Sequence, residues 1–149
     1  MNICRGVLPF IIVMLTLACG SCSEKPEKVP TDCDINSGSC VKEAGQVGLK
    51  AVFNITPKPV RSMAEVLFSV VLKRDTSPVT DASVSVDLTM PGMFMGTNRP
   101  VLKHVGAGRY EGKGFILRCP SGSRVWKAEV LIGRGGRNYS AGYTFEVKD

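Results

Sequence analysis

The stretch "ASVSVDLTM", residues Ala82–Met90, alternates strictly between two kinds of side chain. Every second residue is apolar, and the residues between them are serine, aspartate or threonine; the apolar set is Ala82, Val84, Val86, Leu88 and Met90. Successive side chains of a β-strand point to opposite faces. The alternation therefore predicts a strand with one face in a hydrophobic core and the other in water.

The same period of two recurs on both sides of this stretch, with turn residues between the segments. The further segments are "VGLKAVFNITP" (47–57), "AEVLFSVVLK" (64–73), "PVLKHV" (100–105), "GRYEGKGFIL" (108–117), "RVWKAEVLI" (124–132) and "YSAGYTFEV" (139–147). No stretch has helical periodicity. The pattern predicts an all-β fold, a single immunoglobulin-like antiparallel β-sandwich of about seven strands over residues 46–149, with Trp126 at the centre of its core.

The N-terminus has the layout of an export signal. Arg5 precedes an apolar run, Val7–Leu17, that is too short to span a bilayer permanently. The following "LTLAC" is similar to a bacterial lipobox, which predicts a signal peptide at residues 1–18 and a lipid on Cys19. Ser21, where aspartate would retain a lipoprotein in the inner membrane, favours the outer membrane, with the domain facing the periplasm. The alternative is an ordinary cleaved signal and a free periplasmic product.

Residues 19–45 are polar and include the charged, proline-containing "SEKPEKVPTD", which predicts a flexible linker after the lipidated cysteine. An exported chain meets an oxidising compartment, where disulfides persist. Cys33 and Cys40 are close together in "DCDINSGSC", a polar stretch that can close on itself, and we expect a local disulfide between them. Cys119 then either pairs with Cys22 or stays free.

Charge and composition argue against two functional classes. The formal net charge is +6, and the excess lies in the C-terminal half, but neither a groove-reading helix nor interleaved aromatics accompany it, so nucleic-acid binding is not expected. The one histidine, His104, has no neighbouring nucleophile, and no glycine-rich phosphate loop follows a strand. We therefore expect no enzymatic activity and no small-molecule substrate.

The stretch "TMPGMFMGTNRP", residues 89–100, is the best candidate for chemistry because thioethers are soft ligands that suit Cu(I). Met93 and Met95 carry this copper hypothesis, with Met90, His104 or Cys119 assisting. His104 is on the next predicted strand, and the turn before that strand can return it to the same end of the sandwich. Met90 continues the apolar register of the preceding strand, which makes it the weakest ligand of the three methionines. The alternative is structural: methionine fills irregular cores, and the loop then closes one end of the sandwich.

Several motifs together resemble the YtkA-like domain family, which is related to the periplasmic part of FixH proteins. They are the "MPGMFMG" loop, the "GAGRYEGKG" hairpin, the "SGSRVWKAEV" strand and the final "YTFEV" strand. The resemblance extends over about residues 47–149. It implies a small immunoglobulin-like sandwich attached to a membrane or exported, and FixH-type members are associated with copper supply to haem–copper oxidases. This chain differs in having a lipoprotein signal and in its cysteines at positions 33, 40 and 119.

Two functions follow as expectations. The first is a non-enzymatic, lipid-anchored periplasmic domain that binds or relays copper through its methionine loop. The second is a structural or interaction module of the cell envelope, whose loop is a core plug or docks a partner protein.

Overall fold

Nine β-strands form the fold in the computed structural model, which describes residues 29–45 and 48–148. They are β1 (Cys40–Glu43), β2 (Leu49–Thr56), β3 (Glu65–Arg74), β4 (Ser77–Pro78), β5 (Ser83–Thr89), β6 (Val101–Gly106), β7 (Arg109–Phe115), β8 (Val125–Arg134) and β9 (Arg137–Glu146). The described ranges contain no helix, so none there could cross a membrane. The all-β prediction is confirmed, and each predicted strand is present; β1 and β4 were not predicted. The predicted signal peptide, Cys19 and Cys22 lie outside the described residues.

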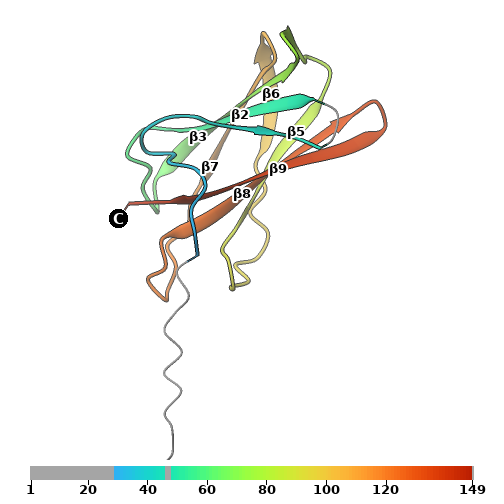
Figure 1. The fold of residues 1–149 in the computed structure, drawn as a ribbon. Helices are drawn as coiled ribbons and strands as arrows, with labels where there is room; N and C mark the ends of the chain where they lie inside the picture. Colours follow the sequence, from blue (N-terminus) through green and yellow to red (C-terminus); the bar gives the residue numbers. More distant parts are fainter. Residues whose placement is uncertain (1–28, 46–47, 149) are drawn as a thin grey trace, which may run out of the picture.

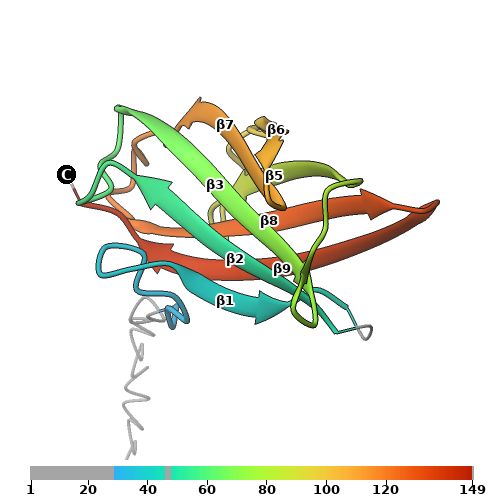
Figure 2. The same ribbon diagram turned by 90° about the horizontal axis from the view of Figure 1, so that it is seen from above.

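The strands pair antiparallel in the order β1-β2-β3-β7-β6-β5-β8-β9, and β4 pairs with β3. Strand β6 pairs with β7 near its end and with β5 near its start, which joins the two layers into one sheet. The sheet folds onto itself, so that β2 and β3 lie across β8 and β9 (Figure 1, Figure 2). Its two terminal strands, β1 and β9, come close to each other.

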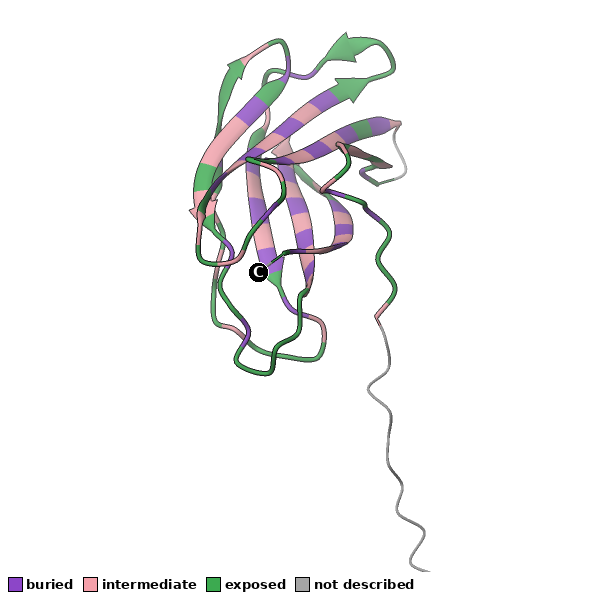
Figure 3. Ribbon diagram, turned by 90° about the vertical axis from the view of Figure 1, so that its left-hand side faces the viewer, coloured by how far each residue is buried: buried purple, intermediate pink, exposed green. Residues whose placement is uncertain are grey.

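The core lies between the layers and takes every second residue of each long strand, as the alternation predicts (Figure 3). In β3 the buried residues are Val66, Phe68, Val70 and Leu72, and in β8 they are Trp126, Ala128, Val130 and Ile132. Aromatic rings fill the centre: the ring centroids of Phe53 and Tyr143 are 5.0 Å apart. The Tyr143 hydroxyl donates to the Ala51 carbonyl at 2.7 Å, which satisfies the one polar group of this cluster.

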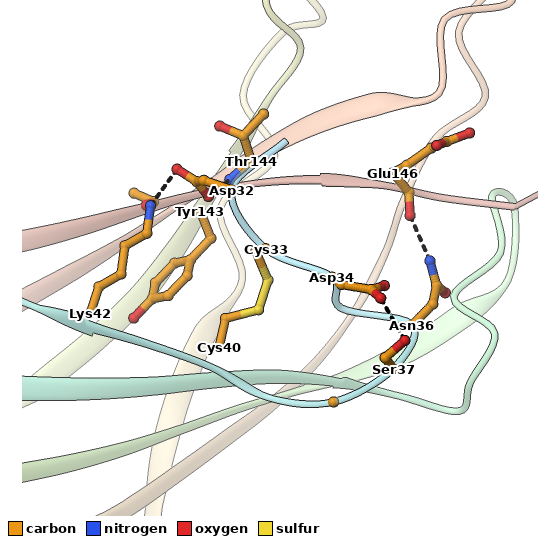
Figure 4. The surroundings of a disulfide bond; sticks show 12 residues. Asp32, Cys33, Asp34, Asn36, Ser37, Cys40, Lys42, Tyr143, Thr144 and Glu146 are labelled. Atoms are coloured by element: carbon orange, nitrogen blue, oxygen red, sulfur yellow. Dashed lines mark hydrogen bonds and ion pairs between the residues drawn. A yellow bond between two sulfur atoms is a disulfide. The ribbon is translucent and has the colours of Figure 1, made fainter. Parts of the chain in front are cut away.

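The segment from residue 32 to residue 44, here called the clasp, covers the free edge of β9 (Figure 4). The Asp32 and Cys33 N–H groups donate to the Thr144 carbonyl, and the Thr144 N–H donates to the Asp32 carboxylate. The Asn36 side chain donates to the Glu146 carbonyl at 2.8 Å. These bonds satisfy backbone groups that an edge strand otherwise leaves without partners.

A disulfide and a buried side chain hold the clasp in place. Cys33 and Cys40 form the predicted disulfide, and Ile35 is fully buried in the core. The prediction of a flexible linker over residues 19–45 is therefore wrong for residues 32–44. Pairing of β1 with β2, the disulfide and hydrogen bonds to β9 attach the segment, and contacts of this kind leave no periodic apolar pattern in the sequence.

Candidate functional site

The methionine loop begins with a tight turn that the sequence specifies. The Met93 N–H donates to the Met90 carbonyl at 3.1 Å, and Gly92 between them has φ 76°. Proline at the second position and a glycine with positive φ at the third are the signature of a type II turn. After the turn the chain returns beside β5, where the Leu88 N–H donates to the Asn98 carbonyl at 2.9 Å.

The turn places the three methionines in different surroundings. Met90 is buried and continues the inward face of β5, as its register predicts. Met93 is 38% exposed, and Met95 is half-buried and packs against the core. Phe94, between them, is 92% exposed. Met93 and Met95, which together carry the copper hypothesis, therefore lie in different surroundings.

The structure brings one other sulfur to Met93. The Sγ of Cys119 lies 3.7 Å from the Met93 Sδ, although the two residues are far apart in the sequence. They meet because the β5–β6 loop and the β7–β8 loop extend from the same end of the sandwich (Figure 1). Among the described cysteines, Cys119 is the one without a disulfide, and it is buried. The predicted alternative of a bond to Cys22 lies outside the described residues.

The Cys119 thiol lies in a turn that supplies hydrogen-bond donors. The Gly122 N–H donates to the Cys119 carbonyl at 3.0 Å, which closes a turn with Pro120 at its second position. The Ser121 hydroxyl lies 2.9 Å from the Cys119 Sγ. The hydrogen bond from this hydroxyl is the main cause that holds the pKa of the Cys119 thiol below its ordinary value. Backbone N–H groups of the turn lower this pKa further; they belong to Ser121, Ser123 and Gly122. The turn thus favours the thiolate, the form that binds metals.

His104 is not part of this sulfur pair. It pairs with Tyr110 near the turn between β6 and β7, and the centroids of the two rings are 5.1 Å apart. Cys119 follows the other end of β7, and Phe115 at that end is about 16 Å from Tyr110 at the usual rise of a strand. The expectation that the chain returns His104 to the methionine end is therefore wrong.

Other clusters of metal ligands are absent from the parts of the chain that the structure describes: no three His, Cys, Asp or Glu side chains gather there. The candidate site is the thioether of Met93 beside the thiol of Cys119. Sequence reasoning named both residues but did not pair them. The turn signal "CPSG" was the one local indication that Cys119 is held in a fixed position.

The fold and this site define a class of protein: a small antiparallel β-sandwich with a methionine loop at one end. Residues 43–118 match the YtkA-like family, and the chain belongs to that family. The matched range runs from the end of the clasp to the residue before Cys119. The strand with Trp126 and the last strand lie beyond this range, although the predicted resemblance included both. Neither a search of curated proteins nor a search of solved structures returns a match.

Proposed function

We propose that this protein is a lipid-anchored periplasmic domain that binds Cu(I) through Met93 and Cys119 and passes it on by ligand exchange, without enzymatic chemistry. The observation that carries the proposal is the 3.7 Å between the Cys119 Sγ and the Met93 Sδ. A metal–sulfur bond of about 2.3 Å, the length known for zinc thiolates, lets one ion bind two sulfurs up to about 4.6 Å apart. The separation falls within that reach.

The donor set suits Cu(I) better than a hard cation. Thiolate and thioether are soft ligands, and no carboxylate takes part. The thiol must lose its proton to bind, and the hydrogen bonds from the Ser121 side chain and the turn amides favour that loss. Met93 lies at the surface, where a ligand from an acceptor can replace it. Met90 and Met95 support the loop from the core side and do not bind the metal.

Competition for Cu(I) against a chromogenic chelator tests the proposal in the full-length protein with the Cys33–Cys40 disulfide intact and Cys119 as the thiol. Met93→Leu and Cys119→Ser each weaken binding by at least about tenfold, which corresponds to the loss of about 1.4 kcal/mol. Met95→Leu removes a thioether from the same loop and is the matched control, with affinity close to that of the wild type. Thermal unfolding of each variant verifies that the fold is intact. Equal affinity in all four proteins overturns the proposal.

The outer-membrane anchor is a separate part of the proposal, supported by the likeness of "LTLAC" to a lipobox. Cells that express Cys19→Ser should not incorporate labelled palmitate into the protein and should release it to the soluble periplasmic fraction. Cys22→Ser removes the neighbouring cysteine and should leave both properties unchanged. Lipid incorporation in Cys19→Ser, or its loss in Cys22→Ser, contradicts the assignment to Cys19.

A second candidate function is docking of an envelope protein on the methionine loop. It is favoured by Phe94, a large apolar side chain that is 92% exposed at the tip of the loop. A photo-crosslinking residue in place of Phe94 should give a discrete adduct in living cells. The same residue in place of Val105, which is also exposed but lies near the opposite end, should give none. Absence of the adduct at position 94, or the same adducts at both positions, contradicts docking through this loop.

A further inference from the structure

A cleft of about 260 Å³ opens next to the turn at Cys119, and Cys119 is one of its lining residues. Three separate parts of the chain form it: the connection between β2 and β3, the loop between β7 and β8 with the start of β8, and the end of the chain after β9. The lining residues that bear on its chemistry are Ser62, Arg118, Cys119, Arg124 and Trp126.

Two buried polar atoms of this lining have no hydrogen-bond partner within the described ranges. They are the Trp126 Nε1 and the Ser62 Oγ, and the third such atom of the structure, the Asn54 Oδ1, lies elsewhere. Trp126 is 1% exposed, so bulk solvent does not reach its side chain. An indole N–H can only donate. A buried donor without an acceptor lowers the stability of the fold by about 1–3 kcal/mol, and such donors are rare in native proteins.

The charged side chains that line the cleft in the described ranges are positive. Arg118 and Arg124 line it, and among its lining residues within 29–45 and 48–148 none is acidic. Arg124 is itself ion-paired, because its Nε lies 3.4 Å from a Glu146 carboxylate oxygen. The described lining therefore carries two donors without partners and the Arg118 guanidinium, with no carboxylate of its own.

We infer that this cleft binds a small oxyanion, a carboxylate or a phosphate group, which accepts hydrogen bonds from the Trp126 indole and the Ser62 hydroxyl and pairs with the Arg118 guanidinium. An oxyanion supplies acceptors for both orphaned donors at once. Charge-assisted hydrogen bonds of this kind are stronger than neutral ones, and a guanidinium holds both carboxylate and phosphate. The inference does not depend on copper, because none of these three groups is a sulfur ligand.

Trp126 provides a direct readout because it is the one tryptophan of the chain, so the protein has a single indole N–H signal in a nitrogen-15 correlation spectrum. The copper-free, full-length protein with the Cys33–Cys40 disulfide intact is titrated with inorganic phosphate, with acetate, and with chloride at matched ionic strength. We expect a saturable shift of the indole signal with phosphate or acetate and none with chloride. The stronger of the first two identifies the chemical source of the oxyanion.

Two pairs of variants assign the binding to these residues. Arg118→Gln should weaken the oxyanion at least about tenfold, as expected for the loss of a charged partner, whereas Arg137→Gln, which removes an exposed charge from the β8–β9 hairpin, should not. Ser62→Ala should also weaken binding, and Met93→Leu should leave it unchanged, which separates this test from the copper titration. An indole signal that does not saturate with either oxyanion, or equal binding by Arg118→Gln and Arg137→Gln, overturns the inference.

Discussion

Two pairs of neighbouring sulfur atoms in residues 29–45 and 48–148 differ in their sequence separation, bonding and surroundings. Cys33 and Cys40 are close in sequence, and their sulfurs are joined by a covalent bond. Cys119 and Met93 are distant in sequence, and their sulfurs are 3.7 Å apart, in hydrogen-bond contact but without a covalent bond. The first pair closes a short loop at the free edge of β9. The second pair joins two loops at one end of the sandwich.

The surroundings explain why one pair stabilises the fold and the other is suited to chemistry. The closed pair lies in the clasp, whose polar groups bond to the β9 backbone and whose Ile35 fills the core. The open pair has a donor-rich turn on the Cys119 side and a solvent-exposed thioether on the Met93 side. A disulfide consumes its thiols, whereas an unbonded thiol and thioether stay available as ligands. The following predictions test this contrast between the two regions.

The largest difference should be between Ile35→Ala in the clasp and Phe94→Ala in the methionine loop. Ile35 is fully buried, and removing such a side chain lowers the free energy of unfolding by about 2–5 kcal/mol. Phe94 is 92% exposed, and its loss should change the free energy by no more than about 0.5 kcal/mol. Urea unfolding measures both. Similar values for the two variants would show that the clasp is not part of the core.

Removal of the disulfide should have the next largest effect. The double variant Cys33→Ala, Cys40→Ala frees a short loop, and the chain-entropy relation gives a loss of about 2–3 kcal/mol. Cys119→Ala removes a buried thiol that closes no loop and should cost about 1 kcal/mol. Thermal and urea unfolding under oxidising conditions compare them. An equal or larger loss in Cys119→Ala contradicts the division into a stabilising pair and an open one.

The clasp should also make stability depend on pH through Asp32. Partial burial raises the pKa of this carboxyl, but hydrogen bonds from Lys42 and the Thr144 N–H outweigh it and hold the pKa below 3.8. A depressed pKa in the folded state stabilises the protein above the pKa of the unfolded state, and the stabilisation disappears as the pH falls through the folded value. Asp32 is 49% exposed, so the contribution stays below about 1 kcal/mol.

Asp32→Asn tests this dependence. The variant should unfold at lower urea concentration than the wild type near neutral pH, and the two midpoints should converge in acid below the folded pKa of Asp32. Asp75→Asn, a substitution at an exposed turn outside the clasp, is the control. A difference between wild type and Asp32→Asn that grows in acid has the wrong sign and contradicts the assignment.

The smallest effect concerns the reactivity of the open pair. Ser121→Ala removes the hydroxyl 2.9 Å from the Cys119 Sγ, so the pKa of the thiol should rise toward its ordinary value. Alkylation of Cys119 by iodoacetamide at neutral pH should then slow severalfold, because the thiolate is the nucleophile. Ser123→Ala keeps the backbone N–H through which Ser123 acts and should react like the wild type. Equal rates in Ser121→Ala and the wild type contradict the role of the hydroxyl.

Much of the fold was predictable because the strands carry their signal locally. The alternation of Val84, Val86 and Leu88 is visible without any knowledge of their partners, and all three are buried as predicted. The clasp was missed for the opposite reason: Asp32 and Asn36 are polar residues whose partners, Thr144 and Glu146, are at the far end of the chain. Hydrogen bonds at such separation leave no periodic trace in the sequence.

The candidate site shows the same limit. The type II turn at Gly92 and the turn after Cys119 are local, and "MPGM" and "CPSG" specify both. Local sequence could not show which of four candidate ligands lie close together: Met90, Met93, Met95 and His104. That depends on the strand end at which each residue lies. From the sequence, His104 was expected to return to the methionine end of the sandwich. The pairing of β6 with β7 instead places His104 at the opposite end of the sandwich.

The sequence by itself therefore determined the strands, the turns, the Cys33–Cys40 disulfide and membership of the YtkA-like family, since each rests on residues close together in the chain. Only the tertiary structure decided that residues 32–44 cover the edge of β9, that Met93 meets Cys119, and that Trp126 and Ser62 leave donors at one cleft. These are contacts between segments far apart in sequence. They form because a sheet that folds onto itself brings its strand ends and loops together in an order that local patterns do not encode.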